Sequence, residues 1–479
     1  MKRREFLKLG ALAALPKISF AEEFDDYKAI VVVYLAGGND SFNMFIPTSD
    51  DSDTGYKAYA AARKNIRVNE NELSLNTDDE GKLILKAGNE NPYYVDNQMQ
   101  SAYLKGFYNH KELGLGTNAV MPEIAYLIET KKAAVINNCG NLIMPATKNE
   151  LLEKQKPSPP FLFAHDFQST LMYNGESSIV NYTGWAARVS DLFYGINDSD
   201  VYAMNVSFCG NTHLFDGVKT APMLLPEYGS VKYNSLKKDM FEEFINTNSD
   251  EIGNFYKKLK KHSLLLQEVL NSDFENSYVF TSKNPYGLTL FSSPSAEILG
   301  EKYLTTSLDL LKPLHSCAKW IDIGMKKNLK RQIFYVTLGG FDTHSEQNKT
   351  HSSLLRGLSY SLGDFYLALE ELGIVNQVCV MVVSEFGRSL EENGDGTDHA
   401  WGAGTFVFGG GIKGGRYGDL VNLTLGGNDD ISQKGRFIPK ISFTQYYATV
   451  LKWFGLNDEQ LNIVLPELKN FENKDLGFY

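Results

Sequence analysis

Two apolar runs of strand length, separated by one long amphipathic segment, constrain the fold of this chain more than any other feature. Residues 332–338 (QIFYVTL) and 377–383 (QVCVMVV) are rich in β-branched side chains, as is typical of strands buried on both faces of a parallel sheet. Between them, residues 349–373 repeat apolar side chains at the spacing of an amphipathic helix. Strand, helix and strand in this order predict a β-α-β unit with a right-handed crossover and parallel pairing.

Other segments extend this α/β pattern along the chain. The clearest strand is 28–35 (KAIVVVYL), and residues 132–137 and 201–207 predict two more. Helical spacing is found at 121–130, 255–271, 295–325 and 444–454. We therefore expect an α/β fold built on a mostly parallel sheet.

Two polar or glycine-rich segments have no motif that would give them a ligand. Residues 48–100 are polar, and their acidic runs lack the spacing of a calcium-binding loop, so we interpret them as solvated loops. Residues 409–415 contain G-x-G-x-x-G but are followed by Arg-Tyr-Gly-Asp. A dinucleotide site needs this turn to open a helix, so we expect a loop or hairpin there.

The first 21 residues predict a twin-arginine signal peptide. Arg3 and Arg4 precede an apolar run at 9–15, and the small residues at 19–21 suit a signal peptidase. The alternative is a frayed basic N-terminus. No later stretch approaches about 20 consecutive apolar residues, so no transmembrane segment is expected. We expect the rest of the chain to be exported folded, to the periplasm or beyond the cell.

Composition excludes several classes of protein. The chain has 47 Lys and Arg against 58 Asp and Glu, a formal net charge of −11, which argues against nucleic acid or anionic lipid as a partner. Its four cysteines are scattered, without a C-x-x-C motif, so zinc knuckles, haem attachment and thioredoxin chemistry are unsupported. Which of the three possible disulfide pairings forms, if any, is left open.

Polar side chains follow four of the predicted strands. The groups are Asp40 with Ser41, residues 138–141, Asp342 with His344, and Ser384 with Glu385, and His399 follows in a later loop. Since the carboxyl ends of parallel strands share one edge of a sheet, these groups would converge there. Oxygen and imidazole ligands together suit Zn²⁺ or Mn²⁺ better than Ca²⁺.

Each of these residues also has a plainer interpretation. Asp40 and Asp342 could cap helices, and His344 could be a turn histidine hydrogen-bonded beside Asp342. In the same way, Glu385 could pair with Arg388 and His399 could stack on Trp401. Only their shared position after strands favours a metal site.

The motifs around these residues resemble a known family. They are L35-x-G-G-x-D-x-x-N43, T337-L-G-G-F-D-T-H344, S384-E-F-G-R388, N393-G-x-G-T-D-H399 and F408-G-G-G-x-K-G-G415. In this order they are similar to the exported domain-of-unknown-function family numbered fifteen hundred and one, placed in the alkaline phosphatase and sulfatase superfamily. The resemblance implies a single alkaline phosphatase-like domain over residues 22–479, with a doubly wound sheet, helices on both faces and loop insertions.

The resemblance also implies a ligand set and an activity. One divalent metal would be held by Asp342, His344 and His399, and a second by Asp40 and Glu385. The activity would be hydrolysis of phosphate or sulfate esters, with a small anionic ester as substrate and Arg388 available to bind it.

Two departures from the family pattern favour a different interpretation. Glu385-Phe386 stands where superfamily enzymes have Asp-His, and His165-Asp166-Phe167 stands where many members have Ser-His-Phe. Ser41 is then the first candidate nucleophile, Ser169 and Thr170 are weaker ones, and a metal-bound hydroxide is another possibility. The alternative function is a catalytically inactive relative that binds or assembles with a secreted partner at the periplasm or cell surface.

Overall fold

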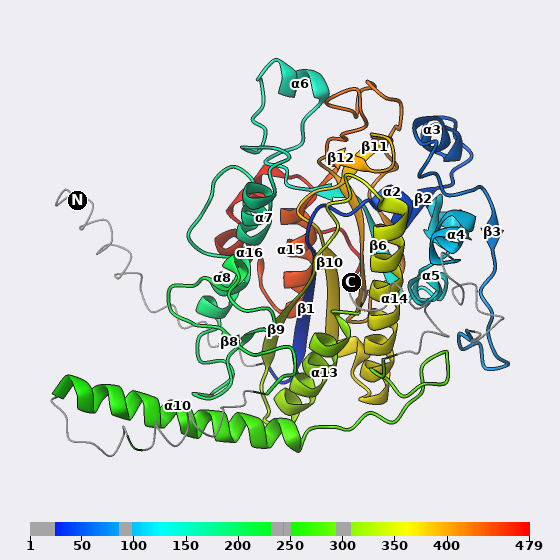
Figure 1. The fold of residues 1–479 in the computed structure, drawn as a ribbon. Helices are drawn as coiled ribbons and strands as arrows, with labels where there is room; N and C mark the ends of the chain where they lie inside the picture. The colour runs from blue at the N-terminus through cyan, green and yellow to red at the C-terminus, as the bar shows by residue number, and fades with distance from the viewer. Residues whose placement is uncertain (1–23, 86–97, 231–242, 244–250, 294–307) are drawn as a thin grey trace.

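A computed structural model describes residues 24–85, 98–230, 243, 251–293 and 308–479 (Figure 1). The predicted signal peptide, residues 1–21, and the start of the predicted helix 295–325 lie outside the described residues. No helix in the described ranges is both long and apolar enough to span a membrane.

A nine-stranded sheet forms the centre of the fold. Its order is β14-β6-β13-β10-β1-β9-β7-β8, with β15 also paired to β6. The strands are β1 (Lys28–Leu35), β6 (Ala133–Gly140), β7 (Asn205–Ser207), β8 (Met223–Leu224), β9 (Arg331–Leu338), β10 (Val378–Val383), β13 (Ala403–Gly409), β14 (Gly415–Tyr417) and β15 (Ile441–Ser442). Within this sheet only β13 runs antiparallel to its neighbours. The predicted α/β class with a mostly parallel sheet is thus confirmed.

The central strands alternate their side chains between two buried layers. Along β1, Val31 and Val33 face one core and Ile30 and Val32 face the other, and all four are at most 3% exposed. Helices cover both layers (Figure 1). One layer holds α5 (Pro122–Glu129), α13 (Leu311–Lys326) and α14 (Gln347–Glu371), and the other holds α8 (Trp185–Leu192), α15 (Phe443–Phe454) and α16 (Asp458–Val464).

The predicted β-α-β unit is present, with one difference in pairing. The strands β9 and β10 are parallel and α14 joins them, but each pairs with β1, which lies between them. The spatial order of strands depends on which apolar faces meet, and the local sequence pattern does not contain it. As a result, the loops after β1, β9 and β10 lie side by side.

Smaller elements surround this end of the sheet. A second sheet contains β2 (Phe45–Pro47), β3 (Glu72–Leu73), β4 (Phe107–His110) and β5 (Leu115–Asn118), and a hairpin pairs β11 (Arg388–Glu392) with β12 (Thr397–His399). The remaining helices are α2 (Ser41–Met44), α3 (Tyr56–Ala62), α4 (Gln98–Lys105), α6 (Lys148–Leu152), α7 (His165–Asn174) and α10 (Glu251–Glu275). Residues 409–415 form a turn that leads into β14, as the sequence predicts.

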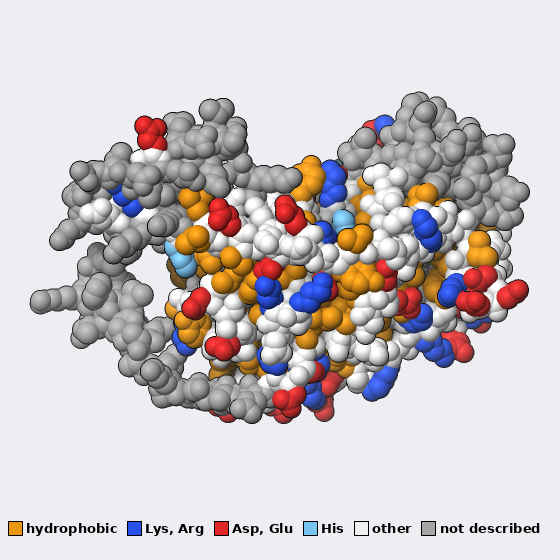
Figure 2. All heavy atoms as spheres, turned by 90° about the horizontal axis from the view of Figure 1, so that it is seen from below, with side chains coloured by type: hydrophobic (Ala, Val, Ile, Leu, Met, Phe, Trp, Pro, Cys, Tyr) orange, Lys and Arg blue, Asp and Glu red, His pale blue; other side chains and the backbone are white. Residues whose placement is uncertain are grey.

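The described surface carries mixed charges, and the cysteines form no disulfide. Seen from below, charged side chains of both signs are interspersed with apolar ones over the described part of that face (Figure 2). All four cysteines are free thiols, and Cys139, Cys317 and Cys379 are buried.

Candidate metal centre

Three segments that are far apart in the sequence meet near the carboxyl ends of the central strands. His165 is the first residue of α7, Asp342 and His344 follow β9, and His399 ends β12. Figure 1 places β11 and β12 at the upper end of the sheet in that view. We call these four residues the His–Asp cluster.

The ring Nε2 atoms of the cluster face the carboxylate of Asp342. Nε2 of His399 lies 3.1 Å from Nε2 of His165 and 2.9 Å from Nε2 of His344. Oδ1 of Asp342 lies 3.0 Å from Nε2 of His399 and 3.1 Å from Nε2 of His344. Oδ2 of Asp342 lies 3.6 Å from Nε2 of His165.

The other ring nitrogen of each histidine contacts an oxygen outside the cluster. The partners of Nδ1 are Oε1 of Glu385 for His165, the carbonyl oxygen of Phe163 for His399, and Oδ1 of Asp398 for His344, at 2.7, 2.7 and 3.5 Å. The carboxylate of Glu385 and the carbonyl of Phe163 accept hydrogen bonds, so Nδ1 carries the proton in His165 and in His399. The Nε2 lone pairs of these two histidines are therefore directed into the cluster.

The loop before α7 holds the carbonyl group of Phe163 in place. Phe161 and Phe163 have positive φ angles of 49° and 73°, which residues other than glycine rarely adopt. The amide of Gln168 donates hydrogen bonds to the carbonyls of Pro160 and Phe161 at 2.9 and 3.2 Å, and Asn141 donates to Gln168 at 3.1 Å. These bonds offset the backbone cost and fix the acceptor of His399.

The surroundings of the cluster favour an ionised Asp342 and a neutral His399. Partial burial alone would raise the pKa of Asp342, but the hydrogen bond and the charge of Arg388 lower it to about 2. Burial lowers the pKa of His399, whereas the hydrogen bond to Glu385 raises that of His165. Asp342 is half-exposed, with 47% of its side chain accessible, so the cluster is open to solvent.

The cluster fits a divalent transition metal. The atoms that His165, Asp342 and His399 offer lie within 4.8 Å of one another, and His344 adds a nitrogen at 3.1 Å from the same carboxylate. Tetrahedral Zn²⁺ with bonds of about 2.0–2.1 Å places its ligand atoms about 3.3 Å apart. The separations among His165, Asp342 and His399, 3.0–3.6 Å, are of that size, whereas His344 does not belong to the group whose atoms all lie within 4.8 Å. Outward hydrogen bonds from the imidazoles are the arrangement usual for metal-binding histidines.

Glu385 lies outside this group. It is 1% exposed, and its Oε1 accepts hydrogen bonds from Nδ1 of His165 and from the backbone of Gly37, at 2.7 and 2.9 Å. Phe386 packs against the rings of His165 and His399 at 4.8 and 4.9 Å. The predicted ligand Glu385 thus orients an imidazole, and Phe386 supplies an apolar wall.

Asp40 is also held away from the cluster. It is fully buried, its two carboxylate oxygens accept hydrogen bonds from both terminal nitrogens of Arg63 at 2.6 and 2.9 Å, and Gln347 donates to Oδ2 at 2.5 Å. Burial would raise the pKa of Asp40, but the charge of Arg63 lowers it. Asp40 also caps α2 by accepting from the backbone of Phe42 at 3.2 Å.

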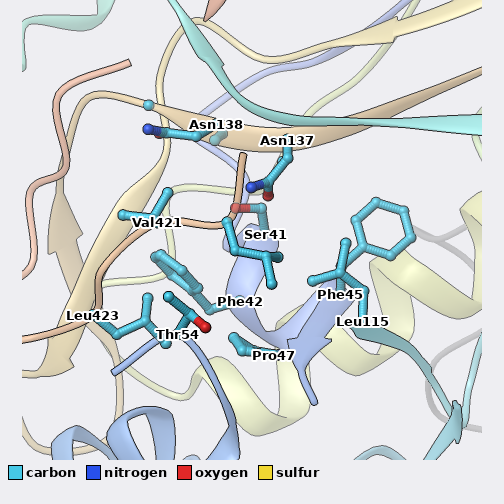
Figure 3. A pocket seen from close by; sticks show the side chains of 14 residues that line it. Ser41, Phe42, Phe45, Pro47, Thr54, Leu115, Asn137, Asn138, Val421 and Leu423 are labelled. Atoms are coloured by element: carbon cyan, nitrogen blue, oxygen red, sulfur yellow. The ribbon is translucent and has the colours of Figure 1, made fainter. Parts of the chain in front are cut away.

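Ser41 lies at a separate pocket. It lines a cavity of about 30 Å³ together with Phe42, Phe45 and residues of β2, β5, β6, β13 and nearby loops, and Figure 3 shows its hydroxyl beside Asn137 within this mostly apolar lining. No residue of the His–Asp cluster lines that cavity. The weaker candidates Ser169 and Thr170 donate hydrogen bonds to the carbonyl of Asp166 in their own helix.

Arg388, predicted to bind an anionic substrate, is buried. Nη1 donates to Oδ1 of Asp342 at 2.7 Å and to the carbonyl of Gly37 at 3.0 Å. Nη2 donates to the carbonyl of Thr397, and Nε to the hydroxyl of the same residue at 3.2 Å. Its side chain has no exposed area, so its nitrogens are occupied by the protein.

The sequence interpretation missed His165 as a member of the cluster. The family pattern places a nucleophile near this residue and therefore gives no reason to expect a metal-binding imidazole there. One signal was available, because a histidine that begins a helix after a Pro-rich loop can point out of that helix end. Its partner Glu385 comes from a segment 220 residues away, which no local pattern reveals.

The comparisons with known proteins add a family and three distant likenesses. Residues 325–465 match the family described as Protein of unknown function (DUF1501). This match includes Asp342, His344, Glu385, Arg388 and His399 and confirms the resemblance over that part of the chain. No curated protein matches the sequence.

Solved structures with some similarity include two proteins whose names state an activity. The chain is 11% identical to Ps i-CgsB, covering 93% of this chain and 77% of that one, with a TM-score of 0.36. It is 11% identical to PsFucS1 sulfatase from Pseudoalteromonas sp. (71% and 63% covered, TM-score 0.31). It is 10% identical to the soluble domain of lipooligosaccharide phosphoethanolamine transferase A from Neisseria meningitidis (92% and 94% covered, TM-score 0.31). At these TM-scores no inference is drawn from them.

Proposed function

We propose that this protein is an exported metal-dependent hydrolase of phosphate or sulfate esters. One observation carries the proposal: the imidazoles of His165 and His399 donate hydrogen bonds through Nδ1 to oxygens outside the cluster and turn their Nε2 lone pairs toward the carboxylate of Asp342. Such lone pairs repel one another unless a proton or a cation lies among them. Because the structure places these lone pairs close together, it favours a cation bound among them.

The ligand set we assign is His165, Asp342 and His399, and His344 lies beside it, in contact with Asp342 and His399. Zinc or manganese suits these nitrogen and oxygen donors. One ion is enough, because Arg63 already balances the charge of Asp40. When bound, the ion would polarise a phosphoryl or sulfuryl oxygen and lower the pKa of a coordinated water.

Basic side chains at the rim of the cluster would attract the anionic part of a substrate. Burial raises the pKa of Asp398, but Asn393, Lys434, His344 and Arg436 together hold it below its ordinary value, so both cations act on this rim. Lys434 is exposed, and the guanidinium of Arg436 lies over the ring of Phe163, 4.7 Å from its centroid. We therefore assign substrate attraction to these two residues instead of the buried Arg388.

Water is the nucleophile that we assign. Among the described residues, no serine, threonine or cysteine side chain is hydrogen-bonded to a residue of the His–Asp cluster. The half-exposed carboxylate of Asp342 leaves room for water and a small ester at the open side.

Metal content tests the first part of this proposal. We expect about one zinc or manganese per chain in protein purified from its native host, and loss of that metal in His165→Ala and His399→Ala. His213→Ala is the matched control, because Nδ1 of His213 binds Asp216 at 2.8 Å without belonging to the cluster. Equal metal content in all three variants would contradict the ligand assignment.

Turnover tests the second part. We expect hydrolysis of an aryl phosphate or aryl sulfate in the presence of zinc or manganese, with kcat/KM reduced at least about 100-fold in Asp342→Asn, as befits loss of a metal ligand. Arg436→Gln should raise KM with little change in kcat. Activity that survives Asp342→Asn would exclude this centre as its source.

One observation also favours a second function: no serine, threonine or cysteine side chain in the described part of the chain is hydrogen-bonded to the cluster. In this alternative the chain keeps the metal as a structural element and binds or assembles with a secreted partner. Bound metal without turnover of any phosphate or sulfate ester would favour it.

We also propose that residues 1–21 direct export by the twin-arginine route to the periplasm or beyond. The support is the Arg3-Arg4 pair followed by a short apolar run. Replacing both arginines with lysine should retain the chain in the cytoplasm, as measured by cell fractionation. Unchanged export would remove this proposal.

A further inference from the structure

A buried chain of hydrogen bonds joins Asp40 to the metal centre. Nε2 of Gln347 donates to Oδ2 of Asp40 at 2.5 Å, and Oε1 of Gln347 accepts from the hydroxyl of Thr397 at 2.7 Å. That hydroxyl accepts from Nε of Arg388 at 3.2 Å. Nη1 of Arg388 then donates to Oδ1 of Asp342 at 2.7 Å. We call this series the Asp40 relay.

The direction of every bond in the relay is fixed by its first member. An ionised Asp40 only accepts, so Gln347 must turn its NH₂ group toward it and its carbonyl toward Thr397. The carbonyl also only accepts, so the hydroxyl proton of Thr397 points at it. A hydroxyl lone pair is then left facing Arg388. Asp40, Gln347 and Thr397 are all fully buried, so water does not substitute for these bonds.

Two further contacts strengthen this order. Arg63 binds both oxygens of Asp40 and keeps it ionised. The hydroxyl of Thr343 also donates to Oε1 of Gln347, at 3.2 Å. Flipping the Gln347 amide would place its NH₂ group against two hydroxyl protons and its carbonyl against a carboxylate.

We propose that Asp40, Gln347 and Thr397 are positioning residues that hold Arg388 against Asp342 and thereby aim this carboxylate at the three imidazoles. The inference rests on the proposed function, since His165, His399 and Asp342 are the proposed metal ligands. Asp342 needs such support because its side chain is half-exposed and lies in a loop. The role of Asp40 is then to orient a ligand of the metal.

The hydroxyl of Thr397 offers a clean test in the full-length protein. Thr397→Val removes the hydroxyl at nearly constant volume, and Thr397→Ser retains it. Thr405→Val is the control, because the hydroxyl of buried Thr405 donates to the carbonyl of Val382 at 2.5 Å and belongs to no relay. We measure the Kd for Zn²⁺ by competition with a chromophoric chelator and the visible spectrum of the Co²⁺-loaded protein.

We expect the Zn²⁺ Kd of Thr397→Val to rise about 10-fold or more, the range found for residues that support metal ligands. Its Co²⁺ spectrum should shift, while Thr397→Ser restores both. Thr405→Val should stay within about 2-fold of the original Kd. Equal losses in Thr397→Val and Thr405→Val would overturn the relay.

Crystal structures of the metal-free protein and of Thr397→Val separate this inference from the proposed function. We expect the original protein to keep the contact between Arg388 and Asp342, and Thr397→Val to lose or lengthen it. If the original protein binds no metal, the proposed function fails, and these two structures still decide the relay. An unchanged contact in Thr397→Val would show that the relay does not hold Arg388.

Discussion

A single buried carboxylate organises the loop that carries Lys434 and Arg436. Asp430 is fully buried. Its oxygens accept hydrogen bonds at 2.9–3.0 Å from the backbone of Gly426, Ser432, Gln433, Gly435 and Arg436. Burial would raise the pKa of Asp430, but these N–H groups together lower it.

We expect Asp430→Asn to lower the free energy of unfolding by about 2–4 kcal/mol, because its NH₂ group would face N–H donors. Because the folded pKa is depressed, this stabilisation is present above about pH 4 and is lost as pH falls below it. Urea unfolding at pH 7 and pH 3 measures both effects. Asp429→Asn, which disturbs the exposed pair with Lys440, should cost under about 1 kcal/mol. Similar costs for both variants would contradict this role.

The contribution of Asp364 to the free energy of unfolding changes with pH in the opposite direction to that of Asp430. Burial raises the pKa of this carboxyl group to about 7, although the backbone of Phe291 donates to it at 2.7 Å. The folded protein then binds a proton that the unfolded chain releases near pH 4. Stability therefore falls as pH rises from about 4 to 7, by at most about 1.4 kcal/mol per pH unit. Asp364→Asn should flatten this slope in urea titrations, and an unchanged slope would assign it to another group.

The residues of the site differ in how far the sequence could place them. Asp342, His344 and His399 follow strands or a hairpin, and their motifs drew attention to them. Asp40 has the same signal, but its partner Arg63 comes from residues 48–100, which the sequence presents only as polar. That guanidinium is fully buried. A pattern of polar residues does not distinguish a buried ion pair from a metal ligand, because both need the same carboxylate.

At the scale of elements, the end of β1 packs against the loop after β9 through Gly37. Its φ angle is +120°, and an added Cβ would lie 2.4 Å from the backbone nitrogen of Asp342. Gly37→Ala would therefore displace the backbone of a proposed ligand. We expect it to cost about 2–4 kcal/mol of unfolding free energy and to weaken Zn²⁺ binding at least about 10-fold.

Gly339 offers the matched control, since it lies in the same loop region with open space around its added Cβ and no positive φ. Gly339→Ala should change stability by less than about 0.5 kcal/mol. Thermal unfolding and chelator competition on both variants make the comparison. Equal stability and equal Zn²⁺ affinity in Gly37→Ala and Gly339→Ala would show that neither property needs the close approach of these loops.

The sequence predicts the bounds of the central strands more accurately than their order and direction in the sheet. The sequence places β1 at its observed bounds and β9 and β10 within one residue, because continuous apolar runs are bounded by polar turns. The insertion of β1 between β9 and β10 and the antiparallel direction of β13 were not predicted. Strand direction and order follow from long-range packing, which a local period does not encode.

At the scale of the whole molecule, the proposed metal site would link His165 in α7 to Asp342 in the loop after β9, 177 residues further along the chain (342 − 165). A cation that binds only the folded chain stabilises it by about 2.7 kcal/mol when its concentration is 100 times Kd. We expect Zn²⁺ to raise Tm by several degrees and EDTA to reverse this. His165→Ala should abolish the response, and His213→Ala should retain it. A Tm insensitive to both metal and EDTA would contradict a resident cation.

The four free thiols bear on where this protein can acquire its native state. No covalent cross-link between sulfur atoms contributes to the architecture, so maturation needs neither an oxidant nor an isomerase. Dithiothreitol should leave the melting temperature unchanged. Such a polypeptide is able to complete its folding in a reducing compartment, as the proposed export of the folded chain would require.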